Sequence, residues 1–316
     1  MKKVFFSLWE FQKQHFEIRL YGAVALLLTV LLIFNYSFDV EDSHIDTLDQ
    51  LWLRWLVFFV YEAGPFLLTG IILYQFDKVV RFFTKPDFWL LWFLGFAVLA
   101  FDRSLHIWEF VRDWFPNPAY RIWFRSIDWT SSLLLTVLPV VLIYEIVGRS
   151  SQYKWYGLIP SKFDPKPYLY LLLITGVFIG IGSFFGDIQA YYPRYRISDG
   201  QQFARYYDVN GWIPLVVFEI SYASNFITVE LFFRGLLIYA FVRYFGAYAV
   251  LPMTVAYCVL HFGKPLTESL SSIAGGYALG ILALKNRNIW GGVILHIGVA
   301  WLMELFGFLQ RWVQHS

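Results

Sequence analysis

Four ionisable side chains interrupt long apolar stretches in the C-terminal half of the sequence. Glu230 and Arg234 lie in one stretch, His261 lies in a second, and His296 lies in a third. Charged groups at membrane depth are costly and usually pair with one another or face the interior of a bundle. Ionisable groups in such surroundings are candidates for functional sites. The three stretches therefore predict one shared polar site.

The first pair of charges has a helical spacing. Residues four positions apart share one face of a helix, so Glu230 and Arg234 are predicted to touch. An unpaired member of such a pair would be very costly in hydrocarbon, so we expect an ion pair. Taken alone, the pair is as consistent with a structural bridge as with a catalytic group.

The second and third motifs are histidines. Tyr257 precedes His261 by four residues, which places both side chains on one helix face, and the residues at 263–265, Gly-Lys-Pro, predict a turn before Glu268. His296 follows a Gly-Gly pair in the last apolar stretch. Either histidine alone reads more readily as a satisfied core residue than as a catalyst.

Taken together, the three motifs resemble the CPBP family of intramembrane endopeptidases, which includes type II CAAX prenyl proteases and bacteriocin-processing and immunity proteins. That family carries Glu-Glu-x-x-x-Arg, then an aromatic residue followed by x-x-x-His, then His-x-x-x-Asn or Asp. The resemblance covers about residues 150–310 and implies a CPBP-like helical core in this part of the chain. The matched positions are Glu230, Arg234, Tyr257, His261 and His296.

Two positions depart from the family pattern. Val229 stands where the family has the glutamate that activates water, and Ala300 stands where it has the Asn or Asp that helps to hold the oxyanion. Hydrolysis needs a base near the water and donors near the developing charge. Three carboxylates are candidates for the base: Glu230 itself, Glu268 after the turn, and Glu304 two turns beyond His296.

A metal centre is a second way to activate the water. His261 and His296 with Glu230 or Glu268 would form a two-histidine, one-glutamate set that leaves a position open for water, with zinc as a possible divalent metal. The sequence contains no His-Glu-x-x-His, no Gly-x-Ser-Gly and no Gly-x-Gly-Asp. The zincin, rhomboid and aspartyl arrangements are therefore absent, and the glutamic and metallo types remain open.

The resemblance implies an intramembrane endopeptidase that cleaves a membrane-associated or prenylated protein or peptide. Glu230 and Arg234 would form the polar anchor, His261 would orient or share the water, and His296 would stabilise the oxyanion. A catalytically inactive relative with an immunity or scaffolding role is the main alternative. A transporter is a further alternative, because buried Glu, Arg and His also line ion paths.

The elements that position these residues are predicted to be membrane helices. Hydrophobic residues make up 58% of the 316 residues and charged residues 15%, against about 45–50% and 25% in soluble domains. About 20 apolar residues of helix cross a bilayer of about 30 Å. The sequence predicts an all-α polytopic protein with about nine spans, at residues 20–37, 53–75, 88–101, 124–147, 168–186, 223–243, 247–262, 268–284 and 289–309.

Residues 212–223 leave three alternatives open. They could form a further crossing, an interfacial helix or the start of the sixth span, and we expect an interfacial or re-entrant lead-in. The small residues of segment 271–280 allow helices to approach closely, so we interpret that segment as packing scaffold.

The loop charges predict the orientation. The connection at 39–50 carries five acidic residues and no Lys or Arg, whereas the loops near residues 78–85, 149–166 and 285–287 are basic. By the positive-inside rule, the N-terminus is predicted to be cytoplasmic, in what we expect to be the plasma (inner) membrane of a bacterium, with no cleaved signal peptide. The basic residues are interpreted as topology signals, so lipids and a peptide substrate, and no nucleic acid, are the expected partners. Cys258 is the single cysteine, which excludes an internal disulfide.

The polar, proline-containing segment 148–167 is the predicted domain boundary. Residues 1–150 would form a membrane region of about four helices, and residues 151–316 the protease-like domain. The N-terminal region also has ionisable residues at membrane depth, and Glu62 is the one least easily explained by a position near a span end. The others are Arg125, Asp128 and Glu145.

Overall fold

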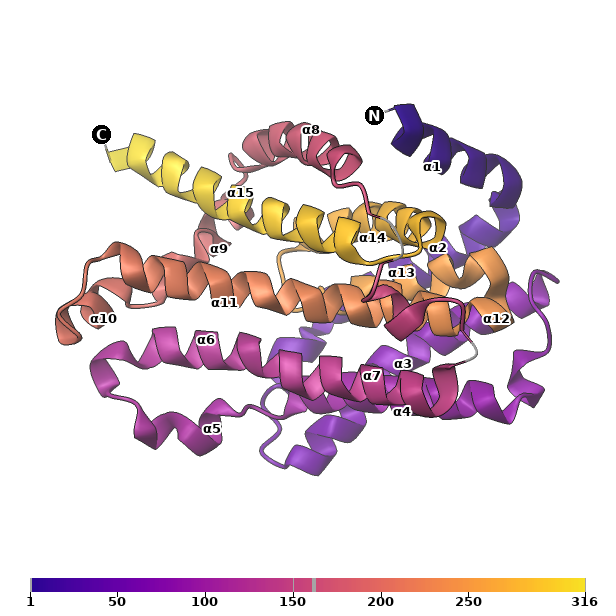
Figure 1. The fold of residues 1–316 in the computed structure, drawn as a ribbon, viewed down its shortest axis with the longest axis horizontal. Coiled ribbons are helices and arrows are strands. Elements are labelled where there is room, and N and C mark those ends of the chain that lie inside the picture. Colours follow the sequence, from indigo (N-terminus) through magenta and orange to yellow (C-terminus); the bar gives the residue numbers. More distant parts are fainter. Residues whose placement is uncertain (1, 150, 161–162, 316) are drawn as a thin grey trace. The chain divides into compact units, whose positions relative to one another are not determined.

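The computed structural model is α-helical throughout, and residues 2–149, 151–160 and 163–315 are described (Figure 1). Within these ranges there is no β-strand. Each predicted apolar stretch coincides with a helix, which confirms the all-α fold class. The long helices are α2 (Ile18–Phe38), α3 (Leu51–Gln75), α4 (Pro86–Ser104), α6 (Tyr120–Ser132), α8 (Lys166–Gly182), α11 (Trp212–Glu230), α13 (Val250–Val259), α14 (Leu266–Asn286) and α15 (Trp290–His315).

The remaining elements precede, connect or extend these helices. The α-helical ones are α1 (Lys2–His15), α5 (Trp108–Val111), α7 (Leu138–Ile143), α9 (Gly186–Tyr191), α10 (Gly200–Tyr206) and α12 (Val242–Phe245). The π-helical ones are η1 (Val40–Ile45), η5 (Leu133–Val137), η6 (Tyr144–Gly148) and η9 (Leu231–Ala240). The 3-10 ones are η2 (Phe82–Thr84), η3 (Arg112–Trp114), η4 (Asn117–Ala119), η7 (Lys154–Gly157), η8 (Arg194–Ile197) and η10 (Gly246–Ala249).

The length and hydropathy of the helices confirm an integral membrane protein. Six described helical stretches are long and apolar enough to cross a bilayer, or up to eight if each of two bent pairs counts as one span. Large apolar side chains on these stretches are exposed, as with Ile33 at 62% and Leu173 at 71%, which suits a surface that faces lipid. The expected span in α14 is helical but falls outside this set.

The expected lead-in at 212–223 is wrong, because these residues begin one continuous helical stretch, 212–240. Pro214 does not interrupt it, since a proline in the first turn removes a backbone donor that has no helical partner there. The helix changes to π geometry at Leu231 and ends at Ala240, before α12. The break therefore follows the Glu230 and Arg234 motif.

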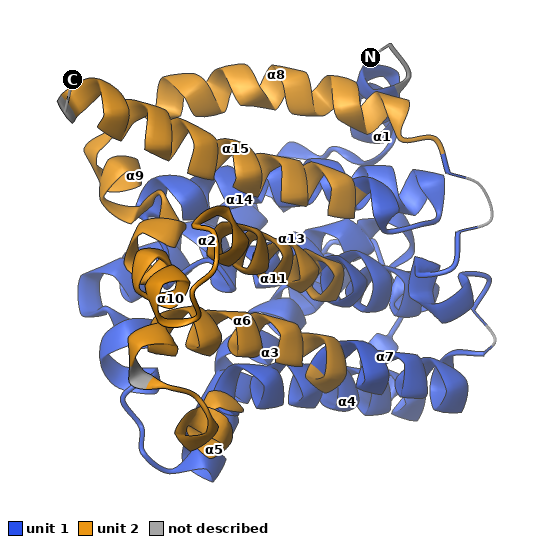
Figure 2. Cartoon of the chain, turned by 60° about the vertical axis from the view of Figure 1, so that its left-hand side comes forward, with its two compact units in different colours: residues 1–105, 136–163, 230–291 blue, residues 106–135, 164–229, 292–316 orange. Residues whose placement is uncertain are grey.

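The chain forms two compact units that alternate along the sequence (Figure 2). Unit 1 comprises residues 1–105, 136–163 and 230–291, and unit 2 comprises residues 106–135, 164–229 and 292–316. Each unit takes segments from both sides of residue 150, so the compact units do not follow the division that we expected there. Helices α1 to α4 and the second motif share unit 1.

Helix α13 is the packing centre of unit 1. It packs against α3 and α14, and also contacts α2 and η9. The interface with α14 depends on glycine: a Cβ on Gly276 would lie 2.6 Å from Tyr257 Cδ1, and one on Gly280 would lie 2.5 Å from Met253 Cε. This close approach supports our interpretation of segment 271–280 as packing scaffold.

Replacing Gly276 with alanine should destabilise the protein by about 1–3 kcal/mol, because the new methyl group overpacks the buried Tyr257 ring. Gly275→Ala is the matched control, since a Cβ there meets nothing within 4 Å. Thermal unfolding of both variants in the same detergent measures the difference. Equal midpoints for the two variants would contradict this account of the interface.

Unit 2 is held together largely by aromatic and glycine contacts. Trp129 of α6 contacts Phe218 and Tyr222 of α11, with ring centroids 5.0 and 4.7 Å apart. Helix α15 packs on α8, where a Cβ on Gly180 would lie 3.1 Å from Phe306. These contacts bring the third motif, on α15, beside α8 and α11.

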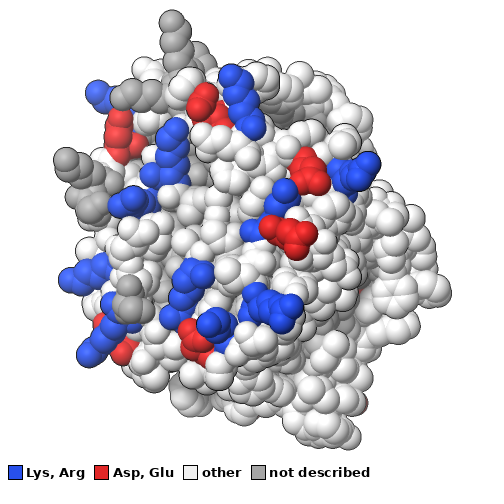
Figure 3. Space-filling view, turned by 90° about the vertical axis from the view of Figure 1, so that its right-hand side faces the viewer, with Lys and Arg blue, Asp and Glu red and all other residues white. Residues whose placement is uncertain are grey.

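The basic connections of unit 1 gather at one end of it. Contacts link them in pairs: Arg243 of α12 with Asp87 at the start of α4, Lys78 with Glu17, and Ile289 with Gly157. Lys and Arg side chains accordingly predominate on the face drawn in Figure 3. The loop after α13 and the acidic η1 after α2 follow the other ends of these two helices, away from the basic connections.

Candidate active site

The first motif forms a completely buried ion pair. Arg234 Nη1 lies 3.1 Å from Glu230 Oε1, and both side chains are 0% exposed. The pair stands at the junction of α11 and the π-helical η9, a geometry that is frequent at functional sites. The expected ion pair is therefore present in the structure.

The guanidinium group of Arg234 lies over the ring of Tyr257, with Cζ 4.2 Å from the ring centroid. Within the described residues, none of its three nitrogens has a hydrogen-bond partner of normal geometry. Buried donors without partners are rare and usually mark a place for water or a ligand. Arg234 thus offers donors to a polar group that enters the site.

The second motif continues from Tyr257 to His261. The Tyr257 and His261 rings meet edge to face with centroids 4.5 Å apart, and His261 Nδ1 lies 2.8 Å from the Tyr257 carbonyl oxygen. This contact fixes the ring and directs Nε2 away from the helix backbone. The structure therefore joins Glu230, Arg234, Tyr257 and His261 into a chain of contacts within unit 1.

The loop after His261 is held by hydrogen bonds from α2 and α14. Ser269 Oγ donates to the His261 carbonyl oxygen over 2.5 Å, and Ser269 Oγ lies 2.6 Å from Tyr36 Oη. Tyr36 also donates to the carbonyl oxygen of Lys264 over 2.7 Å, and Asn35 donates to that of Phe262 over 3.1 Å. The histidine loop therefore rests on the N-terminal helices.

Glu268 lies in the first turn of α14, near the same loop. Its Oε1 atom accepts a hydrogen bond from Lys264 Nζ over 2.6 Å, and its side chain is 12% exposed. This carboxylate is already paired with Lys264, which favours a structural role over that of a base.

The third motif lies in unit 2. His296 stacks on Phe226 with ring centroids 5.2 Å apart, and Ala300 is buried. Glu304 accepts hydrogen bonds from the backbone nitrogens of Arg194 and Tyr195 over 2.6 and 3.1 Å. Both oxygens of Glu304 thus accept hydrogen bonds from the backbone, so this carboxylate has a structural role.

The donor set does not fit a metal centre. In the ranges that the structure describes, no group of three or more His, Cys, Asp or Glu side chains is arranged to hold a metal ion. We therefore derive no chemical step through a metal.

Sequence analysis missed a second buried charge cluster in unit 1. Arg103 Nη1 donates to Glu62 Oε1 over 2.6 Å, and Arg103 Nη2 donates to Glu41 Oε1. Glu62 in the middle of α3 indicated such a cluster, because a buried carboxylate requires a cation. Nothing in the local spacing identified Arg103, at the end of α4, as that cation.

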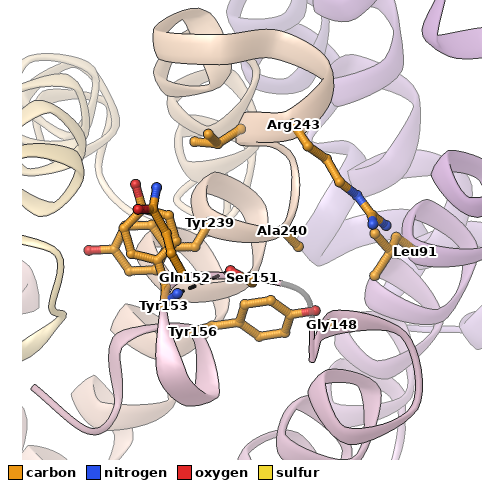
Figure 4. A pocket seen from close by; sticks show the side chains of 10 residues that line it. Leu91, Gly148, Ser151, Gln152, Tyr153, Tyr156, Tyr239, Ala240 and Arg243 are labelled. Atoms are coloured by element: carbon orange, nitrogen blue, oxygen red, sulfur yellow. Dashed lines mark hydrogen bonds between the residues drawn. The ribbon is translucent and has the colours of Figure 1, made fainter.

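A pocket of about 250 Å³ lies at the basic end of unit 1 and contains none of the predicted site residues (Figure 4). Tyr153 stacks on Tyr239 with centroids 4.1 Å apart, and Arg243 lines the opposite side. The buried Tyr156 hydroxyl has no hydrogen-bond partner in the described residues, and burial raises its pKa. The pocket is thus separate from the histidine loop.

Comparison with known proteins agrees with the motifs. Residues 210–302 match the family described as type II CAAX prenyl endopeptidase Rce1-like, which supports membership of the CPBP family. The match includes all three motifs and no part of the N-terminal helices. No curated protein and no solved structure matches the chain.

Proposed function

Proceeding from the CPBP family membership of residues 210–302, we propose that this protein is an intramembrane endopeptidase. Its substrate is a membrane-associated or prenylated protein or peptide. The observation that carries the proposal is the buried constellation of Glu230, Arg234, Tyr257 and His261.

Each side chain has a role that its contacts support. Arg234 pairs with Glu230 and offers donors to the scissile carbonyl group. Tyr257 supports Arg234 through its ring face and orients His261, whose Nε2 binds the attacking water. We keep for His296 the oxyanion role that the family resemblance implies.

We propose a glutamic type of catalysis. Glutamate and histidine side chains are the acid–base groups of the buried constellation, and its donor set does not fit a metal. Proton transfer by a positioned carboxylate contributes about 10²- to 10⁴-fold to the rate of such a reaction.

The proposed location is a bacterial plasma membrane with the N-terminus in the cytoplasm. The gathering of basic connections at one end of unit 1 supports this orientation. In it, the His261 loop lies toward the outer side, beside the acidic connection after α2.

Purified protein in lipid vesicles with single-span and prenylated peptides tests the proposal by mass spectrometry of the fragments. The native protein should cleave, and Glu230→Gln should be slower by about 10²-fold or more. Glu219→Gln is the matched control, because Glu219 is a second glutamate on the same helix and lies outside the constellation. Cleavage by Glu230→Gln at the native rate would reject the proposal.

Val229 and Ala300 favour one other candidate, a non-catalytic relative that binds peptides as an immunity or scaffolding protein. The same assay distinguishes it. A native protein without activity, combined with activity in a Val229→Glu, Ala300→Asn variant, would favour the non-catalytic role.

A further inference from the structure

The N-terminal helices place a buried carboxylate against the histidine loop. Arg103 of α4 binds Glu62 of α3 and Glu41 of η1, so one guanidinium group joins two carboxylates. Glu62 is 0% exposed and Glu41 is 5% exposed. Two carboxylates on one cation leave a net negative charge when both are ionised, so this cluster favours uptake of a proton.

Glu41 lies directly on the loop that follows His261. A Cβ on Gly263 would lie 2.6 Å from Glu41 Oε1 and 3.1 Å from Asp42 Oδ1, so only glycine fits there without displacing the carboxylate. Glu41 is therefore the member of the cluster that meets the histidine loop in this contact.

In each carboxylate of the cluster, one oxygen makes no hydrogen bond with Arg103. Glu41 Oε2 and Glu62 Oε2 are buried and, among the described residues, have no hydrogen-bond partner. A buried carboxylate oxygen without a donor is costly, which points to a water molecule or another ligand beside it. Glu41 meets the histidine loop at Gly263, so its carboxylate group lies at that loop.

We propose that Glu41 is the general base of the peptidase, supplied by the N-terminal region in place of the family glutamate that Val229 replaces. The inference rests on the proposed function. Arg103 and Glu62 are positioning residues, because Arg103 holds Glu41 and Glu62 holds Arg103.

The step balances with water as the only co-reactant. Glu41 takes a proton from water, and the oxygen of the resulting hydroxide forms a bond with the carbonyl carbon of the substrate. The tetrahedral intermediate then breaks its carbon–nitrogen bond, and protonated Glu41 returns the proton to the leaving amine. The products are a carboxylic acid and an amine, which exchange a proton to give a carboxylate and an ammonium group, and Glu41 is again ionised.

The surroundings of Glu41 suit this role. Burial raises its pKa, and the opposing effect of Arg103 does not cancel the increase. Asp42 and Asp46 on its own segment also disfavour its ionised form, and Glu62 on α3 shares the Arg103 guanidinium group with it. The rate should therefore increase with pH, and the midpoint of this increase should lie above the pKa of an ordinary glutamate.

The test measures cleavage in vesicles as a function of pH. Glu41→Gln should lower the rate by about 10²-fold or more and remove the acidic limb of the profile. Asp42→Asn is the matched control, because it removes the neighbouring, exposed carboxylate: it should keep the acidic limb and the rate above it, with the limb moved to lower pH because Asp42 raises the pKa of Glu41. Added formate should restore part of the activity of Glu41→Ala, which a merely structural role would not allow.

The outcomes separate this inference from the proposed function. If Glu41→Gln cleaves within threefold of the native rate while His261→Ala is inactive, the inference is overturned and the proposed function stands. If Glu41→Gln unfolds, the formate experiment on Glu41→Ala decides, and no recovery overturns the inference. Absence of cleavage by the native protein rejects the proposed function itself.

Discussion

Replacing His261 with alanine is expected to lower peptide cleavage by about 10²- to 10⁴-fold, the range that a positioned acid–base group contributes. Its Nδ1 atom lies 2.8 Å from the Tyr257 carbonyl oxygen, so the proposed role in binding water is assigned to Nε2. The substitution also removes one buried hydrogen bond, which costs only about 1 kcal/mol of stability. Initial rates of peptide cleavage in vesicles, measured beside thermal unfolding, separate the two effects.

His106→Ala is the matched control, because His106 is a partly exposed histidine of unit 2 that faces Asp128. It should keep the native rate. A folded His261→Ala protein with native activity would show that this histidine is structural, and the assigned role would then be wrong.

Replacing Arg234 with alanine should destabilise the protein by about 3–5 kcal/mol, because it leaves Glu230 as a buried charge without its cation. The double variant Glu230→Leu, Arg234→Met should recover most of that stability, because apolar groups of similar volume can replace a buried ion pair. Chemical unfolding in detergent micelles measures the three free energies.

The recovery is the decisive part of this prediction. A double variant as unstable as Arg234→Ala would mean that Arg234 stabilises the fold through its contact with Tyr257 and not through charge. In that case the ion pair would not be the anchor of the site.

Helical spacing correctly predicted the local half of the site. Positions four apart on a helix face each other, so the contacts of Glu230 with Arg234 and of Tyr257 with His261 followed from the sequence. Hydropathy likewise predicted the helices, because the bilayer requires apolar segments of a known length.

Contacts between distant segments could not be predicted in this way. Arg103 and Glu41 are 62 positions apart, and only the packing of α3 and α4 brings Arg103 to Glu62. The π-helical turn after Glu230 was also missed, because its ten residues are all buried and have an ordinary apolar pattern. Tertiary packing decides such features.

The N-terminal region is the clearest case of contacts that the sequence could not predict. From the sequence it was a membrane region of unknown purpose, since its charges match no motif. In the structure, α2 supplies Asn35 and Tyr36 to the histidine loop, and η1 supplies Glu41. These contacts give residues outside the family match a direct connection to the second motif.

Hydrolysis in water enriched in heavy oxygen tests the central claim most directly. The native protein should produce a fragment whose new C-terminal carboxylate carries a single heavy oxygen, and Glu230→Gln should produce this fragment at least about 10² times more slowly. A labelled fragment formed at the native rate by Glu230→Gln would contradict the account.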